Sequence, residues 1–199
     1  MDKSETRKKI LLLRDSMDRA VKQKSDEIIR KKVISLINDR QIDTVLTYVS
    51  FRSEVDTYGI IGECLERGIQ VAVPRVHKPH ISFYLIGSTA DLTDGYMSIR
   101  EPSEGCTPYI CPLPGDDDVR SPERVLLIAP GSVFDAMCDR IGYGGGYYDR
   151  FLDANPDIYS VGLAYGCQMV DAVPVDEWDH PVDMVITDEE IYHNTHQNT

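Results

Sequence analysis

The stretch Arg140-Ile141-Gly142-Tyr143-Gly144-Gly145-Gly146-Tyr147-Tyr148-Asp149-Arg150 holds four glycines in five positions, with an arginine at each end. An apolar run at 125–129 lies upstream, and a segment of helical character at 147–152 follows directly. A strand, a glycine loop and a helix start present backbone N–H groups to phosphate, because glycine permits close approach and positive φ. The stretch therefore predicts an α/β unit with an anion site at its loop.

A glycine cluster by itself is weak support for phosphate binding, because many such clusters are only tight turns. The stretch matches neither the Walker pattern nor the dinucleotide fingerprint in its usual place. The charged and aromatic neighbours favour an anion site, because a simple turn has no need of Arg140, Tyr147, Tyr148, Asp149 and Arg150.

Composition indicates an ordinary soluble globular protein that forms one domain over residues 1–199, with 42% apolar and 27% charged residues. The net charge of −12 argues against nucleic acid or an anionic membrane as a partner. It does not exclude anionic small molecules, because a local cluster of Arg and Lys can dominate a cleft.

The five cysteines are odd in number and lack Cys-x-x-Cys spacing, so we expect free thiols. With a charged N-terminus and no run of transmembrane length, we expect a cytoplasmic protein, and a monomer by default.

Helical periodicity dominates the N-terminal part of the chain. Ile10, Leu13, Met17 and Val21 recur at helical spacing and predict a helix over 3–23. A second helix is predicted over 25–38, with Ser25 as its N-cap. Lys3 and Arg7 lie four residues apart on a different face of the first helix. Periodicity alone favours a solvated edge for these two cations.

The rest of the chain alternates between strand and helix patterns. A β-rich run at 42–49 precedes a helix that Asp56 or Thr57 can cap and Gly68 can end, and a strand at 69–73 stops at Pro74. Further strands are predicted at 81–86, 125–129, 158–165 and 184–187, whereas 88–123 reads as mostly loop with a solvated aspartate triplet at 116–118. The pattern predicts a three-layer α/β/α fold with a largely parallel, Rossmann-like open sheet.

Three segments are predicted at sheet ends where ligands bind in such folds: 51–57, the glycine loop and 182–184. Asp56 is interpreted as a helix cap, and the role of Glu54 stays open between capping and substrate binding. Asp149 could hold Mg²⁺ beside a phosphate or pair with a neighbouring arginine. Cys138 could be a nucleophile, but an inert thiol is the commoner case, and no histidine lies near it in sequence.

The segment 129–135 together with 140–152 resembles the signature of the 5-formyltetrahydrofolate cyclo-ligase family, also called methenyltetrahydrofolate synthetase. Lys3-x-x-x-Arg7, the Ser53-Glu54-Val55-Asp56-Thr57 segment, 73–75 and 182–186 are similar to further family segments. The resemblance covers nearly the whole chain in the right order. The glycine signature is specific, and the other segments would be weak alone.

The resemblance implies an ATP- and Mg²⁺-dependent conversion of 5-formyltetrahydrofolate to 5,10-methenyltetrahydrofolate, through phosphorylation of the formyl oxygen and release of ADP and phosphate. It implies ATP-phosphate contacts from Lys3, Arg7, Arg140, Gly142, Tyr143, Gly144, Gly145, Gly146, Tyr147 and Tyr148. It also implies that Arg140 and Tyr147 act in catalysis, that Phe51, Glu54 and Tyr147 contact the folate, and that Asp149 and Asp183 hold Mg²⁺.

The chain departs from the pattern of many family members at Gly145, where they carry lysine. This departure removes a cation near the phosphates, which Arg150, Lys3 or Arg7 could offset. Two other functions stay open on the sequence: an ATP-dependent ligase or kinase acting on another heterocycle, and a non-catalytic module that binds a nucleotide or a folate. The combination of Lys3, Arg7, Glu54, Arg140, Asp149 and Asp183 speaks against the module.

Overall fold

The computed structural model describes residues 2–95, 99–111 and 124–195. Its α-helices are α1 (Lys3–Asp15), α2 (Arg19–Asp39), α3 (Tyr58–Glu66) and α4 (Tyr147–Ala154). Its strands are β1 (Thr44–Thr47), β2 (Gln70–His77), β3 (His80–Ile86), β4 (Leu92–Asp94), β5 (Arg100–Pro102), β6 (Val125–Ala129), β7 (Val133–Asp135), β8 (Arg140–Ile141), β9 (Tyr159–Ala164), β10 (Met169–Val170), β11 (Met184–Thr187) and β12 (Ile191–His193). The described residues also form the short 3₁₀ turns η1 (Thr89–Asp91) and η4 (Gly166–Gln168).

A seven-stranded sheet in the order β12-β11-β9-β6-β1-β2-β3 forms the centre of the fold. The five strands from β11 to β2 pair in parallel, and the edge strands β3 and β12 pair antiparallel. The chain starts at β1, adds β2 on one side and then β6, β9 and β11 on the other. The direction of winding therefore reverses between β1 and β6, and ligands bind beyond the carboxyl ends of the strands at such a switch point. The predicted α/β class with a largely parallel open sheet is confirmed.

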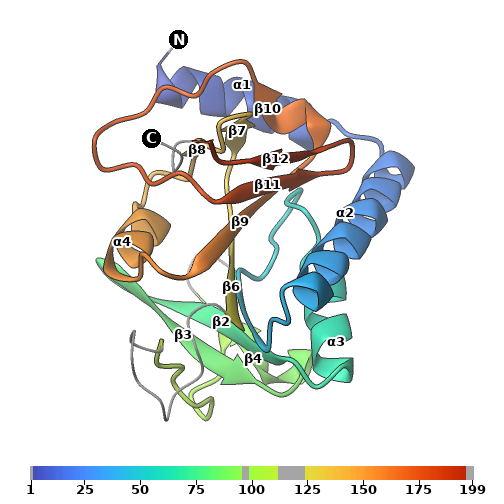
Figure 1. The fold of residues 1–199 in the computed structure, drawn as a ribbon, viewed down its shortest axis with the longest axis vertical. Helices are drawn as coiled ribbons and strands as arrows, with labels where there is room; N and C mark the ends of the chain where they lie inside the picture. Colours follow the sequence, from blue (N-terminus) through green and yellow to red (C-terminus); the bar gives the residue numbers. More distant parts are fainter. Residues whose placement is uncertain (1, 96–98, 112–123, 196–199) are drawn as a thin grey trace.

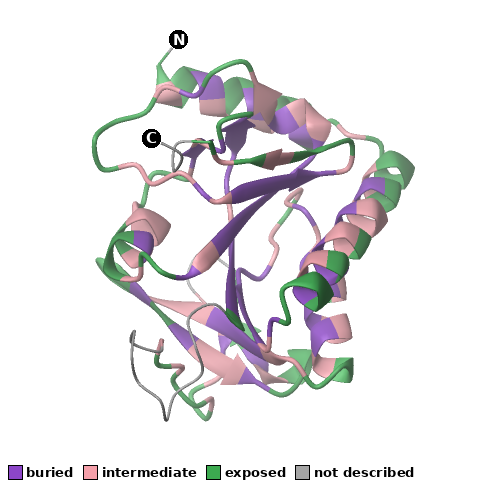
Figure 2. Cartoon of the chain, in the orientation of Figure 1, coloured by how far each residue is buried: buried purple, intermediate pink, exposed green. Residues whose placement is uncertain are grey.

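The alternation of side chains along β6 shows why the sheet is covered on both faces. Leu126 and Ile128 point into the cluster formed with α2 and α3. Val125 and Leu127 point to the opposite face, where they pack with Leu152 of α4. Figure 1 shows α2 and α3 on one side of the sheet and α4 on the other, and Figure 2 shows β6 and most of β9 buried.

The second outer layer contains a β-hairpin as well as a helix. β7 and β8 pair antiparallel between β6 and the glycine loop, and β10 joins them. Phe134 of β7 packs so closely on the main sheet that a Cβ on Gly131 or Gly162 would lie 2.4 Å from its ring. The sequence pattern placed the glycine loop directly after β6. That prediction was wrong, because the hairpin intervenes and delivers the loop from the end of β8.

The N-terminal region forms two helices as predicted, but the break between them lies at 16–18, inside the helix predicted over 3–23. α1 ends at Asp15, and α2 begins at Arg19 because Asp18 accepts hydrogen bonds from the N–H groups of Ala20 and Val21. Ser25 therefore lies inside α2 and is not its cap. Of the predicted apolar face, Ile10 is buried, but Leu13 is 47% and Val21 55% exposed. The break turns α1 across the end of the sheet, while α2 packs on its face.

Of the remaining predictions, the Asp56 cap and the free cysteines agree with the structure, whereas the predicted strand end at Pro74 is wrong. Asp56 caps α3 by accepting from the N–H groups of Tyr58 and Gly59, as predicted. β2 runs through Pro74 to His77 instead of stopping there, since β1 pairs only with residues up to Ala72 and the missing N–H is tolerated beyond that point. All five cysteines are free. The triplet at 116–118 lies outside the described residues.

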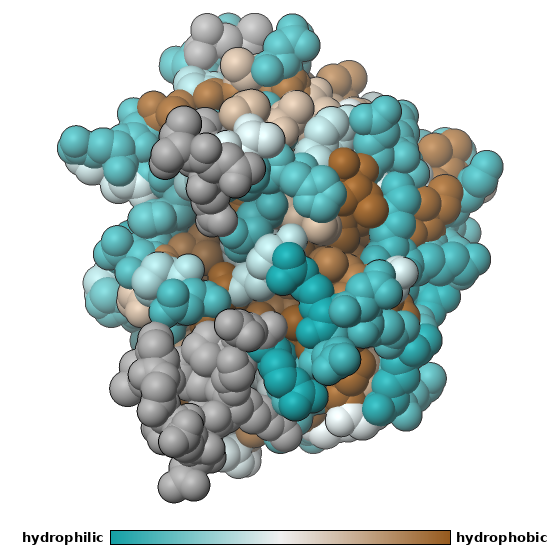
Figure 3. Space-filling model, in the orientation of Figure 1, coloured by the Kyte–Doolittle hydropathy of each residue, from teal (hydrophilic) through white to brown (hydrophobic). Residues whose placement is uncertain are grey.

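The described surface is mainly hydrophilic on the face shown in Figure 3, with apolar side chains visible in the middle of the view. In the described residues, no helix combines the length and the apolar character needed to cross a membrane.

Candidate active site

A cleft of about 550 Å³ opens beside the glycine loop. Four parts of the chain form it: the start of α1, the end of β8 with the glycine loop, the first turns of α4, and a loop just before β11. The lining residues are Lys3, Arg7, Arg140, Ile141, Gly142, Gly144, Gly146, Asp149, Arg150, Asp153, Glu177, Trp178, Asp179 and His180. The structure thus brings together most of the predicted phosphate-binding residues.

The glycine loop takes a conformation that requires glycine at two positions. Gly144 has φ +91° and Gly146 has φ +62°, both in the left-handed region that side chains disfavour. Gly146 is also the N-cap of α4, and no side chain caps this helix start. The first N–H groups of α4 therefore lack intrahelical partners beside the cleft. This arrangement suits an anion, and the donors are the fixed backbone N–H groups of the loop and helix start.

Arg140 is the most buried cation of the cleft, only 5% exposed. Its Nη2 donates to Asp149 Oδ1 at 2.8 Å, and its Nε is buried without a hydrogen-bond partner. Burial lowers the pKa of Arg140, although the negative charge of Asp149 opposes this effect. A buried guanidinium nitrogen without an acceptor is costly, and an oxygen of a bound phosphate would supply the missing acceptor.

Arg7 and Lys3 reach the cleft from α1, so the solvated edge that periodicity favoured is not what the structure shows. Arg7 Nε donates to Gly142 O at 2.9 Å, and its two terminal nitrogens have no hydrogen-bond partner among the described residues. Lys3 Nζ donates to Asp176, at 2.6 Å, and to Asp179. Burial works to lower the pKa of Lys3, but these hydrogen bonds and charges outweigh it and raise the pKa.

Arg150 borders the cleft but is held by carbonyl groups. It donates to Pro79 O and to Gly145 O, and its guanidinium lies over the Tyr147 ring. These contacts tie the glycine loop to the turn between β2 and β3. In this conformation Arg150 stabilises the loop.

The two predicted metal ligands have different surroundings. Asp149 lines the cleft and pairs with Arg140, which is the alternative that the sequence left open. Asp183 accepts from the backbone N and the Oγ of Ser160 at 2.7 and 2.8 Å, and it is not a lining residue. Three other carboxylates, Asp153, Glu177 and Asp179, line the cleft. In the described ranges no group of three or more His, Cys, Asp or Glu residues forms a ready-made metal cluster.

Glu54 lies in the loop between β1 and α3, at the switch point of the sheet. Its Oε2 accepts from the backbone N of Phe51 at 2.8 Å. Burial raises the pKa of Glu54, although hydrogen bonding to Tyr143 and to Phe51 N and the charge of Arg14 oppose the shift. Arg14, which the sequence did not single out, donates to Tyr143 and to Ser53 and so joins α1, the glycine loop and the Glu54 loop.

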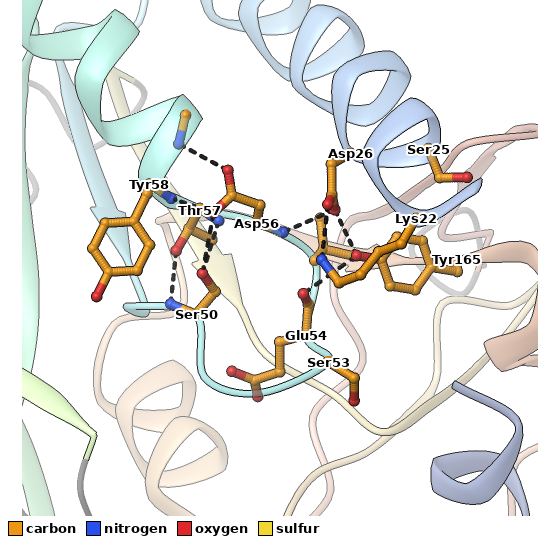
Figure 4. Close-up of polar contacts among 12 residues, drawn as sticks. Lys22, Ser25, Asp26, Ser50, Ser53, Glu54, Asp56, Thr57, Tyr58 and Tyr165 are labelled. Carbon is orange, nitrogen blue, oxygen red and sulfur yellow. Dashed lines mark hydrogen bonds and ion pairs between the residues drawn. The ribbon is translucent and has the colours of Figure 1, made fainter. Parts of the chain in front are cut away.

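Two residues from other elements hold the Glu54 loop from behind. The Tyr165 hydroxyl donates to Asp26 Oδ1 at 2.5 Å and lies 3.2 Å from Glu54 O. The same Asp26 oxygen accepts from Asp56 N at 3.0 Å, and Lys22 pairs with the other oxygen. Figure 4 shows Asp26 and Tyr165 on one side of the loop and the Glu54 carboxylate directed away from them. No local sequence pattern indicated this support.

The neighbouring tyrosines of α4 take different positions. Tyr147 borders a second hollow of about 390 Å³ between α4 and β3 and does not line the cleft. A Cβ on Gly145 would lie 2.6 Å from its ring. The Tyr148 hydroxyl is buried without a partner, and burial raises its pKa.

Cys138 is fully buried, which raises its pKa to about 12 and fits the inert thiol.

Comparison with known proteins matches residues 1–188 to the 5-formyltetrahydrofolate cyclo-ligase family. The chain belongs to this family. The 5-formyltetrahydrofolate cyclo-ligase of Escherichia coli strain K12 is 32% identical over 155 residues, which are 75% of this chain and 80% of that protein. The Haemophilus influenzae cyclo-ligase is 27% identical over 90% of this chain and 94% of that protein.

A solved structure agrees with this membership. The NMR structure of Aquifex aeolicus 5,10-methenyltetrahydrofolate synthetase has a TM-score of 0.81 and 32% identity, and the match covers 98% of this chain and 94% of that one. The family resemblance expected from the glycine signature is therefore confirmed, together with the ligase class of its members.

Proposed function

We propose that this cyclo-ligase family member closes the ring of 5-formyltetrahydrofolate to give 5,10-methenyltetrahydrofolate, and uses ATP and Mg²⁺ to do so. The observation that carries the proposal is the cleft in which the glycine loop, Arg7 and the buried Arg140 converge in a chain of this family. The unpartnered nitrogens of Arg7 and Arg140 fit the oxygens of a triphosphate.

The chemistry requires activation of a poor leaving group. Transfer of the γ-phosphoryl group to the formyl oxygen lets the neighbouring folate nitrogen attack the formyl carbon, and phosphate then leaves as the ring closes. The protein must position two substrates and neutralise charge during transfer. Arg140 is suited to the second task, because its position is set by burial and by Asp149.

The phosphate contacts divide between backbone and side chains. The loop from Gly142 to Gly146 offers N–H groups, and Arg7 offers its two terminal nitrogens. Lys3 has three N–H donors and uses two of them on Asp176 and Asp179, so one remains for phosphate. Tyr143 would contribute through its position between the loop and Glu54, and Tyr148 through its unpartnered hydroxyl.

Mg²⁺ would neutralise part of the negative charge of the phosphates, as it does in other phosphoryl transfers. Asp149 is the best placed of the two predicted ligands, since its carboxylate lines the cleft. Asp183 would need to exchange its contacts with Ser160 before it could reach an ion. We therefore place Asp149 at the ion and Asp183 in support of the loop that precedes β11.

The folate would enter from the switch-point side, where Glu54 can accept hydrogen bonds from the pterin and Phe51 can pack beside it. Tyr147 borders the second hollow and lies against Gly145. We assign it to support of the loop rather than to direct contact with the formyl group.

The test is a near-ultraviolet absorbance assay of the protein with 5-formyltetrahydrofolate, ATP and Mg²⁺. We expect the methenyl absorbance band to grow only when all three are present, and Arg140→Ala to lower the rate strongly. Arg140→Lys is the matched control, because it keeps the charge but cannot form a planar two-pronged contact. Growth of the band without ATP, or an Arg140→Ala rate equal to wild type, would contradict the proposal. Turnover of ATP with another formamide but not with this folate would favour the alternative heterocycle.

A further inference from the structure

Trp178 is the only tryptophan of the chain, and it stands 66% exposed at the cleft. A tryptophan buries about 150–250 Å² when it packs, so this side chain leaves most of its apolar area in water. The hydrophobic clusters of the described residues do not include it. Core packing therefore does not explain the position of this tryptophan at the cleft.

The segment that carries Trp178 is held on both sides. Asp176 and Asp179 flank the tryptophan, and both accept from Lys3 of α1. The turn is closed by Asp179 N, which donates to Asp176 O at 3.1 Å, and by Asp176 N, which donates to the Asp179 carboxylate at 2.6 Å. On the other side, His180 N donates to Asp149 at 3.4 Å, and the His180 ring lies 3.7 Å from Asp153.

These contacts join the segment to α1 and to α4, which both contribute to the cleft lining. The exposed indole is thus a side chain on an anchored backbone. An aromatic ring held at the mouth of an anion-binding cleft is suited to stack on the flat ring of a ligand whose charged end lies deeper.

We propose that Trp178 is the stacking surface for the nucleobase of the bound nucleotide. The inference rests on the proposed function for the presence of ATP. The inference goes beyond the proposed function by naming the residue that binds the base. Trp178 shares its cleft with Lys3, Arg7 and Arg140, whereas Glu54 and Phe51, which we assign to the pterin, do not line that cleft. The nucleobase is therefore the aromatic ring within reach.

Tryptophan fluorescence can test the proposal, because Trp178 is the single tryptophan and all indole emission of the chain therefore comes from it. Emission from wild type, excited at the red edge of indole absorption, is followed during titration with ATP, with inorganic tripolyphosphate and with 5-formyltetrahydrofolate. Calorimetry then gives the affinities of Trp178→Ala, Trp178→Phe and Val175→Ala for ATP, for tripolyphosphate and for 5-formyltetrahydrofolate. Val175 is the matched control, since it is 53% exposed in the same loop but does not line the cleft.

We expect ATP to change the emission more than tripolyphosphate does. Trp178→Ala should weaken ATP binding by roughly 10-fold or more, leave tripolyphosphate binding unchanged and keep the fold, while Trp178→Phe recovers part of the affinity. Val175→Ala should behave as wild type. Equal weakening of ATP and tripolyphosphate would mean that the change disturbs the phosphate site, and would overturn the inference.

Three further results would overturn it in distinguishable ways. If Trp178→Ala binds ATP as tightly as wild type, the base lies elsewhere and the proposed function stands. If 5-formyltetrahydrofolate alone changes the emission and only its affinity falls in Trp178→Ala, the indole faces the pterin. If wild type binds neither ATP nor tripolyphosphate, the nucleotide site itself is wrong and the inference falls with it.

Discussion

Glu54, which we propose binds the pterin, shows at the residue scale how a group kept for a ligand would work against stability. Its carboxylate is held in place by Phe51 N and by hydrogen bonding to Tyr143, yet burial raises its pKa. A carboxyl group whose pKa is higher in the folded state destabilises the fold as pH rises through that pKa. The charged form is thus present at a cost, which is typical of a group kept for its ligand.

Glu54→Gln should therefore be at least as stable as wild type at neutral pH. Its advantage should shrink as pH falls through the raised pKa and should be lost below the ordinary carboxyl pKa, where Glu54 is protonated in the folded and unfolded states alike. The KM for 5-formyltetrahydrofolate should rise by about 10-fold or more, because the amide cannot act as a charged acceptor. Denaturant unfolding at several pH values and steady-state kinetics measure both effects. A variant that is less stable than wild type at neutral pH would contradict this view of Glu54.

Gly145 is the second case at this scale. Its φ is not in the left-handed region, so the need for glycine comes from the Tyr147 ring, which would lie 2.6 Å from an added Cβ. We expect Gly145→Ala to lower the free energy of unfolding by about 1 kcal/mol or more through overpacking. In a Tyr147→Ala background the same change should be neutral or stabilising.

Gly62→Ala is the control for the Gly145 experiment. Gly62 lies inside α3, and a Cβ there would meet nothing within 4 Å. Gly62→Ala should therefore raise the free energy of unfolding by roughly 0.5–1 kcal/mol, as in other helix interiors. If Gly145→Ala stabilises the wild type as Gly62→Ala does, Tyr147 does not restrict this position. A lysine there, as in many family members, would then need no movement of the ring.

At the scale of elements, α2 and β9 act together on the loop that carries Glu54. Asp26 of α2 and Tyr165, which follows β9, contact the backbone of Asp56 and of Glu54 (Figure 4). Tyr165 is 1% exposed, so its hydroxyl has no access to bulk water as a substitute partner. The backbone of the Glu54 loop is thus held by elements to which we assign no substrate contact.

Tyr165→Phe removes the hydroxyl and leaves Asp26 with fewer donors. The free energy of unfolding should fall by about 1–3 kcal/mol, as expected for a buried hydrogen bond to a charged group. The KM for 5-formyltetrahydrofolate should rise several-fold while the KM for ATP stays close to wild type. The matched control is Tyr58→Phe, whose ring is 36% exposed and whose hydroxyl makes no described hydrogen bond. Equal changes in both KM values would indicate general loosening instead of loop positioning.

At the scale of the whole molecule, α1 closes the site from outside the main sheet. Ile10 packs with Val133 and Ile141 of the hairpin, Arg7 contacts Gly142 O, and Arg14 contacts Tyr143. A ligand that binds between α1 and the glycine loop should therefore stabilise the folded chain. For one site, the gain is about 2.7 kcal/mol at a ligand concentration 100-fold above Kd.

We expect ATP to raise the thermal midpoint of wild type, and Arg7→Ala to reduce this rise at the same ATP concentration. Arg7→Ala should change the ligand-free midpoint little, because Arg7 makes one described hydrogen bond. Lys9→Ala is the control, since it removes a positive charge from the exposed face of the same helix. Thermal unfolding with and without ATP measures the difference. An undiminished rise in Arg7→Ala would remove Arg7 from the phosphate site.

Local pattern was sufficient for the parts of the molecule whose structure depends on near neighbours. The run Val125–Ala129 is apolar enough for a strand buried on both faces. Asp56 caps α3 by accepting from N–H groups two and three residues further along the chain. The glycine signature predicted the family and the loop conformation, since positive φ at Gly144 and Gly146 is a property of glycine itself. The alternation of these elements predicted the α/β class.

The convergence of the site was decided only by the tertiary structure. Lys3 meets Asp179 across 176 positions, Arg14 meets Tyr143 across 129, and Tyr165 meets Asp26 across 139. No period or spacing records such contacts, because they arise when α1 turns away from α2 and the β7–β8 hairpin carries the glycine loop to meet it. The sequence by itself determined the α/β class, most of the central strands and the glycine loop; packing decided which of the candidate phosphate-binding residues share a cleft, because side-chain contacts across the fold depend on how the elements are placed.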